Sequence, residues 1–539
     1  MMRYIRLNKN NKLILKTYHY RFFCKFNNYL FRIYIDDKYF DSIVNISDKA
    51  IKFSKVNNKW IIIFLVISIP RYLYIIFNHN LLPDSYFYLT IARNISDGCG
   101  FASNYLPGDC EPLVGGYFPG YPYFIYLVKS LGFGNKVIPL IVSFCTTISL
   151  LYFISTLNRL GLEGKRLYFY SFFIGLSPIS IGFSRFILIE PIIYIFSITL
   201  ITELIKIISN PKDFKAIFKR FIVLSILTIY FKPTSFVLLI PIIFSVLILF
   251  GLAKFIKYSI IFLLIMSFSI LPWGLRDIKY GATIPFKVNS SMAPKNVKGF
   301  AKWVSSFSLT EYDYALSMFP LIAHNNGDRK KVKLIISHNP FINNKDKDYK
   351  QAREILDKEN PEIKRGFTKE EESEFLEMAK ERFKKNGFLG NIFLFVIKST
   401  GVLLNPLNSW GWPASIGVDA SYHNLNISQI IKSLLKIFLF IYRVFIFSLF
   451  LKNLLNFLRL FNPYKLFSKT NKRLLQDNLF LISSLLVLSI NLIMYIGIFG
   501  FLEHRYFYQI MPWVEVSVLL GLNNFRNLKS YPSIKNNIS

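Results

Sequence analysis

The sequence contains a succession of apolar runs, each long enough to cross a lipid bilayer as a helix. A spanning helix needs about 20 mostly apolar residues, since each residue adds roughly 1.5 Å along the helix axis. Hydrophobic residues make up 53% of the 539 residues, and the mean hydropathy is +0.36. Soluble domains of this size do not normally contain several such runs. The sequence therefore predicts an all-α, polytopic membrane protein.

We expect a bundle of about ten spans with both termini on the cytoplasmic side. The predicted spans are residues 60–77, 137–157, 167–183, 187–207, the two halves of 221–250, 258–273, 433–451, 479–499 and 506–520. Lys232 and Pro233 divide the run 221–250, which is too long for one span. Segment 388–404 is predicted to be re-entrant or interfacial, or one arm of a hairpin, because the span after it must run inward.

The net charge of +33 is concentrated in the short loops between the apolar runs. Basic clusters within 159–166, 212–220 and 452–473 are typical of the cytoplasmic side, whereas the loop around Arg93 carries mainly acids. Because membrane orientation accounts for the basic loops, we expect the lipid bilayer as a partner and no nucleic acid.

These patterns divide the chain into five parts. They are a basic cytoplasmic N-terminal segment (1–59, with no cleavable signal peptide expected), a membrane bundle (60–275) with the first outer loop at 79–136, an extracytoplasmic region with loop helices (276–389), C-terminal membrane helices (390–525) and a cytoplasmic tail (526–539). In the extracytoplasmic region, Thr368 and Glu371 have the spacing of a capping box, which predicts a helix from there to Gly387.

The polar stretch 81–122 separates the first two apolar runs. Pro83 disfavours helix in the residue before it and Asp84 is a good N-cap, so we expect a helix over 85–96 that lies in the membrane interface. Glycines and prolines follow it and predict an irregular, turn-rich path. Cys99 and Cys110 share this outer loop, and the sequence leaves open whether they are bonded.

The motif PDSYFYLTIARNISDGCGF, followed by YFPGYP, resembles the first extracytoplasmic loop of GT-C glycosyltransferases, in particular those of the protein O-mannosyltransferase and aminoarabinose transferase type. The resemblance implies that Asp84 is catalytic and that Tyr88, Ala92 and Arg93 match the motif. Ser85 stands where many members carry a second acidic residue, so a role for an adjacent carboxylate is not carried over.

Three later stretches also resemble the family. SRFILIEPIIYIF contains the acidic residue that opens the fourth span, Glu190; LPWGLRD resembles the end of another helix, with Asp277 where Asn is usual; and HRYFYQIMPW resembles the start of the final span. The resemblance implies a GT-C-like bundle that transfers a sugar from a polyprenyl-phosphate donor to an acceptor hydroxyl on a glycan, lipid or protein. It places the site at the extracytoplasmic face of the cell (inner) membrane.

The expected topology collects charged residues at the outer boundary of the membrane. Asp84, as general base, and Glu190 are the candidate catalytic residues; the candidate ligands of the donor phosphate are Arg93, Arg185, Lys232, Arg276 and Arg505. Such a transfer needs cations for the departing phosphate and a carboxylate for the proton of the attacking hydroxyl. No cluster with metal-ligand spacing is present in the sequence, so no metal ligand is assigned, and a divalent cation is the one cofactor left open.

Simpler roles compete with these assignments. Asp84 can be an N-cap alone, and cations at span ends can be interfacial anchors. Within the membrane, Arg71 and Glu515 are expected to neutralise each other. At the level of function, the alternatives are a flippase or transporter of a lipid-linked sugar, or a non-catalytic assembly subunit. Transporters usually bind their substrate at the midplane and show repeat symmetry, whereas here the charges gather at one face.

Overall fold

The computed structural model describes residues 58–522, except for 78–80, 82, 103–109, 111, 115–117, 282–295, 310–313, 315–316, 319–328, 330–331, 334–335, 337–344, 359–365, 405–426, 462–473, 499 and 501–503. The predictions for the N-terminal segment and the C-terminal tail lie outside the described residues. Contacts divide the chain into two units, Met1–Phe64 and Leu65–Ser539. Of the first unit only the start of one helix is described, and the second contains every other feature discussed below.

The described elements are all helical, with one isolated β-bridge between Ala102 and Pro112. They are α3 (Asn58–Phe77), α4 (Pro83–Ser96), α5 (Gly120–Ser130), α6 (Val137–Arg159), α7 (Gly164–Gly175), α8 (Pro178–Phe183), α9 (Glu190–Ser209), η1 (Pro211–Asp213), α10 (Phe214–Phe231), η2 (Pro233–Leu239), α11 (Ile240–Phe250), α12 (Leu252–Lys279), α13 (Lys298–Ser305), α16 (Lys347–Asp357), α17 (Lys369–Leu404), α18 (Ile427–Leu460), α20 (Leu479–Leu492), the π-helix η5 (Ile493–Ile498), η6 (His504–Ile510) and α21 (Met511–Leu522).

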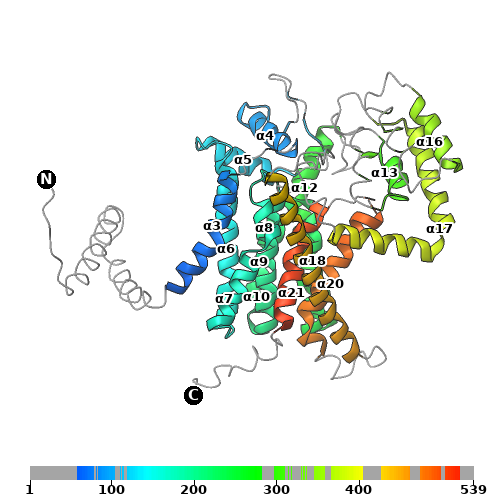
Figure 1. Cartoon of the computed structure of the whole chain (residues 1–539). Coiled ribbons are helices and arrows are strands. Elements are labelled where there is room, and N and C mark those ends of the chain that lie inside the picture. Colours follow the sequence, from blue (N-terminus) through cyan, green and yellow to red (C-terminus); the bar gives the residue numbers. More distant parts are fainter. Residues whose placement is uncertain are drawn as a thin grey trace, which may run out of the picture. The chain divides into compact units, whose positions relative to one another are not determined.

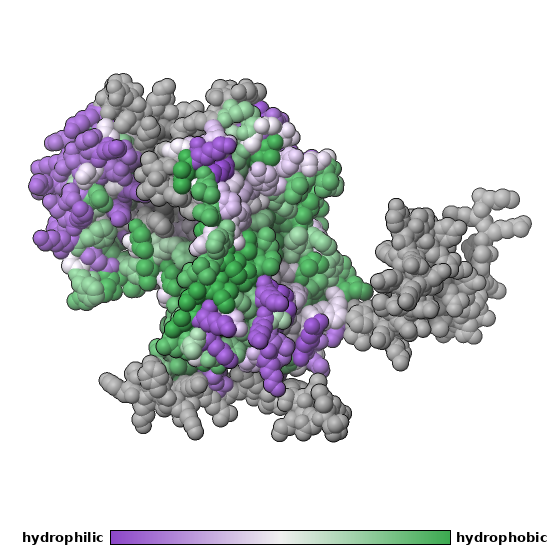
Figure 2. Space-filling view, turned by 180° about the vertical axis from the view of Figure 1, so that it is seen from behind, coloured by the Kyte–Doolittle hydropathy of each residue, from purple (hydrophilic) through white to green (hydrophobic). Residues whose placement is uncertain are grey.

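Among the described residues, eight helical stretches are long and apolar enough to cross a membrane. Figure 2 shows a hydrophobic band across the middle of one face, with hydrophilic residues at its lower end and at the upper left. These observations confirm the class, a multi-pass, all-helical membrane protein. The number of spans stays a prediction, because three of the predicted spans fall outside the eight.

In each of those three cases, the helix in the structure is shorter or carries more charged residues than the predicted span. Residues 167–183 are divided between α7 and α8, and the final span is divided between η6 and α21. The fifth span lies in α10, which begins at Phe214 and therefore includes Lys215, Lys219 and Arg220. Conversely, α17 meets the length and composition criteria through its apolar second half, residues 388–404.

Proline sets where several helices begin and end. Pro83 opens α4, Pro178 opens α8, and Pro233 follows Lys232, at which α10 stops. A proline restricts the residue before it to extended backbone and lacks the N–H that a helix interior requires. A break at Lys232 leaves this cation at the end of a helix and not within a continuous span.

The region 276–389, predicted to be extracytoplasmic, is organised around the first half of α17. The capping box is confirmed: the Glu371 N–H donates to Thr368 Oγ1 at 3.0 Å, and the Thr368 N–H donates to Glu371 Oε2 at 2.9 Å. Near the other end of this half of the helix, Arg382 donates to Asp348, which also accepts from Trp303 Nε1 at 2.9 Å. Partial burial of Asp348 opposes ionisation, but hydrogen bonds from Arg382 and Trp303 outweigh it and lower the pKa of this carboxyl.

A kink divides α17 at the position where the sequence predicts the helix end. Gly387 has φ 67° and ψ 178°, a conformation that L-residues with a side chain rarely adopt. The chain then continues as a helix through residues 388–404, so the predicted end is a change of direction. Whether this second half spans the bilayer or returns to the same face stays a prediction.

A disulfide joins Cys99 and Cys110 in the first outer loop. By closing a loop of about 12 residues it is expected to contribute on the order of 3 kcal/mol to the order of that loop. Mass spectrometry of a digest made without reduction should find the linked peptide in protein purified from its native membrane. Finding two free thiols instead would contradict the assignment and the oxidising compartment it implies.

The predicted orientation can be tested by cysteine labelling. In a background with Cys24 and Cys145 replaced by serine and the disulfide left oxidised, Tyr105→Cys is expected to react with a membrane-impermeant maleimide from outside, and Lys465→Cys is not. The reason is the contrast between the acidic loop around residue 105 and the basic loop around residue 465. Labelling of residue 465 from outside would show that the orientation is the reverse of the predicted one and that Asp84 does not lie at the outer face.

Candidate functional site

Asp84 lies in the first turn of α4, a helix that begins two residues earlier than the sequence predicts. The helix therefore starts before the predicted N-cap, since Pro83 is already helical and Asp84 is the second residue of the helix. Proline is well suited to a first helical position because its missing N–H has no partner there anyway. The half-buried Asp84 carboxylate remains at the positive end of the helix dipole.

Helix α4 packs on α5 through the apolar face that the sequence predicts. Ile91 and Ala92 are buried, and the rings of Tyr88 and Tyr121 meet edge to face with centroids 4.8 Å apart. In Figure 1, α4 and α5 lie at the upper end of the helices. Gly120 allows α5 to approach α10, because a Cβ there would lie 2.8 Å from the Tyr230 carbonyl oxygen. The pair of helices is thereby held against the end of α10, next to Lys232.

Glu190 and Lys232 form a buried ion pair. Lys232 Nζ lies 3.1 Å from Glu190 Oε1, and the two side chains are only 12% and 5% exposed, respectively. Lys232 Nζ also lies 5.1 Å from the centroid of the Tyr506 ring. Three separate elements, the start of α9, the break after α10 and η6, therefore converge on one ammonium group.

Tyr121 connects this ion pair to α4. Its side chain is fully buried, and its hydroxyl makes no hydrogen bond within the described part of the chain. Burial, and after it the charge of Glu190, raise the pKa of the Tyr121 hydroxyl well above its ordinary value. The hydroxyl therefore stays protonated and can donate a hydrogen bond beside the carboxylate.

We call this set the outer cluster. It consists of Asp84, Tyr88, Tyr121, Glu190, Lys232 and Tyr506. Asp84 precedes Tyr88 by one helical turn on the same face, a spacing that brings Cβ atoms to about 5–6 Å. The outer cluster combines two carboxylates, one ammonium group and three phenols around the ends of five elements.

Among the other predicted phosphate ligands, Arg93, Arg185 and Arg276 have described contacts with residues outside the outer cluster. Arg93 is exposed and pairs with Asp97 at 3.3 Å, at the opposite end of α4 from Asp84. Arg185 is buried and lies over the rings of Tyr74 and Phe186, at 5.5 and 4.4 Å. The side chains of His504 and Arg505, at the start of η6, are outside those described. Of the five predicted phosphate ligands, Lys232 is the one whose contacts among the described side chains place it in the outer cluster.

Arg276 holds the first outer loop in place. Its Nη1 donates to the Leu113 carbonyl at 2.9 Å and to Asp277 Oδ1 at 3.1 Å, and its Nη2 donates to the Phe101 carbonyl at 3.0 Å. The guanidinium also lies 4.5 Å from the Trp273 ring centroid. These contacts tie the two ends of the disulfide loop to the end of α12. They give Arg276 a positioning role that the sequence did not indicate.

Arg71 and Glu515, which the sequence analysis expects to neutralise each other, lie close enough to interact electrostatically, although no direct ion pair joins them within the described residues. Arg71 donates to the Ile67 carbonyl at 2.5 Å and to Ser180 Oγ at 3.0 Å. Glu515 Oε1 instead accepts from Ser177 and Tyr442, each at 2.7 Å. Both side chains are buried and hydrogen-bond to neutral groups, but Arg71 Nε and Glu515 Oε2 make no hydrogen bond within the described residues.

Two members of the outer cluster were missed by sequence reasoning. Tyr121 belongs to the YFPGYP motif and Tyr506 to the HRYFYQIMPW motif, so both lay within stretches already singled out. Their place in the outer cluster depends on packing between helices that are distant in sequence, which local sequence patterns do not predict. Within the described part of the chain, no group of three or more His, Cys, Asp or Glu residues is placed to hold a metal ion.

Because comparisons with known proteins find no match, a function can be assigned only from the fold and the site. The chain matches no protein-family model, no curated protein and no solved structure. Its class is that of an all-helical, multi-pass membrane protein, with a polar cluster where the first loop helices meet the bundle.

Proposed function

We propose that this protein is a glycosyltransferase that moves a sugar from a polyprenyl-phosphate donor to an acceptor hydroxyl at the outer face of the cell membrane. The observation that supports it best is the outer cluster, in which Tyr121 lies beside the Glu190–Lys232 ion pair and packs against Tyr88, one helical turn after Asp84. The donor's lipid tail can remain in the bilayer while its phosphate and sugar enter the cluster, so no nucleotide-binding domain is required.

In the proposed reaction, Asp84 and Lys232 have different roles. Asp84 accepts the proton of the acceptor hydroxyl as its oxygen attacks the anomeric carbon of the donor sugar. The bond between that carbon and the phosphate oxygen breaks, and the polyprenyl phosphate departs with the bonding electrons. Lys232 stabilises the charge that develops on this phosphate. The acceptor becomes the glycoside, and Asp84 later releases its proton to water.

Glu190 has a positioning role in this scheme. Its ion pair with Lys232 at 3.1 Å holds the ammonium group at the break between α10 and η2. An ammonium group is a flexible point charge, so a fixed partner reduces the entropy lost when the phosphate binds. Arg185 and Arg505 remain proposed donor ligands. Arg276 acts indirectly, by holding the loop that follows α4.

The test is transfer of radiolabelled sugar from polyprenyl-phosphate hexose or pentose donors in membranes that contain the protein, compared with membranes that lack it. We expect labelled glycan, lipid or protein to accumulate only with the protein present. A protein that moves lipid-linked sugar between leaflets of sealed vesicles and transfers none of it would be the flippase of the alternative hypothesis.

A further inference from the structure

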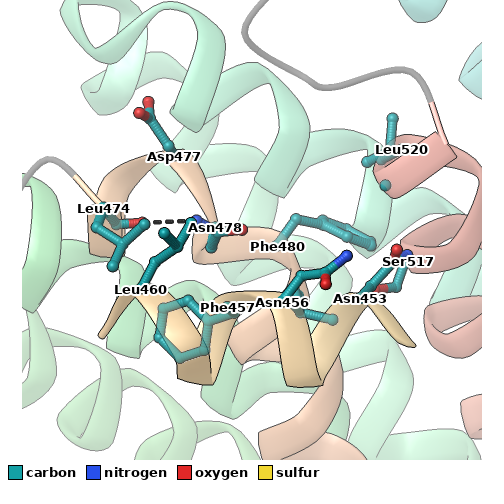
Figure 3. A pocket seen from close by; sticks show the side chains of 12 residues that line it. Asn453, Asn456, Phe457, Leu460, Leu474, Asp477, Asn478, Phe480, Ser517 and Leu520 are labelled. Carbon is teal, nitrogen blue, oxygen red and sulfur yellow. Dashed lines mark hydrogen bonds between the residues drawn. The ribbon is translucent and has the colours of Figure 1, made fainter. Parts of the chain in front are cut away.

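A cavity of about 240 Å³ lies between the ends of α18, α20 and α21, away from the outer cluster. Figure 3 shows side chains from these helices around it. Helix α21 follows η6, which contributes Tyr506 to the outer cluster, and the cavity residue Ser517 lies roughly 16 Å further along the chain by helical rise. Nearby, Gln476 Nε2 contacts the Ile248 carbonyl at the end of α11, which precedes the basic start of α12. The cavity therefore opens at the end of the bundle opposite Asp84.

The cavity is lined by neutral polar groups together with aromatic and aliphatic side chains. Ser517 is 3% exposed, and neither its Oγ nor Asn453 Nδ2 makes a hydrogen bond within the described residues. Asn456 lines the same cavity, and Phe457 and Phe480 supply apolar walls. In Figure 3 the Asp477 carboxylate points away from Asn453 and Asn456. Buried hydrogen-bonding groups normally have partners, so these two point to a hydroxylated ligand.

A recess on α18 adjoins the cavity and shares Asn456 with it. Lys452 and Arg459 line this recess, and neither makes an ion pair within the part of the chain that the structure describes. On the same stretch of helix, Leu451, Leu455 and Leu458 are about half exposed, at 52%, 46% and 51%. The surface thus presents hydroxyl-binding groups, then cations, then an apolar strip.

We propose that this cavity and recess bind the headgroup of a lipid in which a polyol is esterified to phosphate. The polyol hydroxyls bond Asn453, Asn456 and Ser517, the phosphate lies against Lys452 and Arg459, and the hydrocarbon chain follows the exposed leucines of α18. Both glycerol- or inositol-bearing phospholipids and polyprenyl-phosphate sugars have this chemistry. Lipid binding at this site does not require sugar transfer, so the proposal can be tested independently of the proposed function.

Glycine at position 521 keeps the cavity open. A Cβ on Gly521 would lie 2.0 Å from Asn453 Nδ2 and 2.6 Å from its Cγ, a separation that real Cβ atoms do not show. Gly521→Ala is therefore expected to push the Asn453 amide out of position while leaving the backbone in place, because the contact is with the end of a side chain. This variant tests the cavity without removing any polar group.

The experiment is native mass spectrometry of the full chain released from nanodiscs that contain phosphatidylcholine, phosphatidic acid, phosphatidylglycerol, phosphatidylinositol and a polyprenyl-phosphate hexose. Wild-type protein is expected to retain at least one of the three phosphate-linked polyols over both phosphatidylcholine and phosphatidic acid. Asn453→Leu, Gly521→Ala and the double change Lys452→Gln/Arg459→Gln should each lower that retention by roughly tenfold, and Ser517→Ala by roughly fivefold.

Two matched variants serve as controls. Ser483→Ala removes another buried serine hydroxyl without a hydrogen-bond partner among the described residues, but outside the cavity. Lys257→Gln removes an exposed cation of α12 outside the recess. Both should retain lipid as wild type does, and the retained probe identifies the source. Retention of phosphatidic acid equal to that of the polyol lipids, or unchanged retention in Asn453→Leu, Gly521→Ala and Ser517→Ala, would overturn the proposal.

Discussion

Asp84→Asn is expected to lower sugar transfer by roughly 100-fold or more, with little change in the folded state. An amide has nearly the size of the carboxyl group but cannot accept the proton of the acceptor hydroxyl. In the structure Asp84 is inside the first turn of α4, so the change weakens a favourable interaction with the helix dipole, about 0.3–1 kcal/mol. A structural role alone would therefore predict a small effect on transfer.

Asp97→Asn is the matched control for this prediction. Asp97 follows the other end of the same helix, is exposed and pairs with Arg93, so the same chemical change there should leave transfer near the wild-type level. Donor binding by Asp84→Asn should persist or tighten slightly, because Lys232 is untouched and one negative charge leaves the cluster. Transfer rates are compared at equal protein levels in membranes. Undiminished transfer by Asp84→Asn would remove this residue from the mechanism.

Lys232→Met is expected to destabilise the protein by about 3–5 kcal/mol. The change removes the ammonium group that pairs with the Glu190 carboxylate, which is only 5% exposed. Replacing both partners, as Glu190→Gln/Lys232→Met, also removes the buried negative charge and should recover most of the lost stability. The net contribution of the ion pair to the free energy of unfolding would then be far smaller than the loss of stability in Lys232→Met suggests.

Thermal unfolding of the purified protein in detergent measures both variants. Lys380→Met is the control, because Lys380 forms an exposed pair with Glu377, at 61% and 62% exposure, and such pairs contribute little. Its melting temperature should match wild type within error. If Lys232→Met and the double variant melt together at the wild-type temperature, the buried ion pair does not exist in the folded protein.

Local sequence patterns determined the class of this protein and many of its helix boundaries. The apolar runs require membrane spans because a helix satisfies its own backbone hydrogen bonds in a medium that cannot. Prolines determined breaks such as the one at Lys232, since a proline cannot continue the backbone hydrogen-bond ladder. The capping box at Thr368 and the buried face of α4 followed from residue spacing alone. Each of these depends on interactions within a few residues.

The tertiary structure decided which charged residues meet. Glu190 and Lys232 are 42 residues apart in the chain, and only the packing of α9 against α10 brings them to 3.1 Å. Packing likewise assigns Arg276 to two loop carbonyls and places Tyr121 between α4 and Glu190. The sequence identified most of these residues as charged groups at one membrane face, because hydropathy and loop charge set their depth. Their partners depend on how helices distant in sequence pack, and helical periodicity carries no information about that.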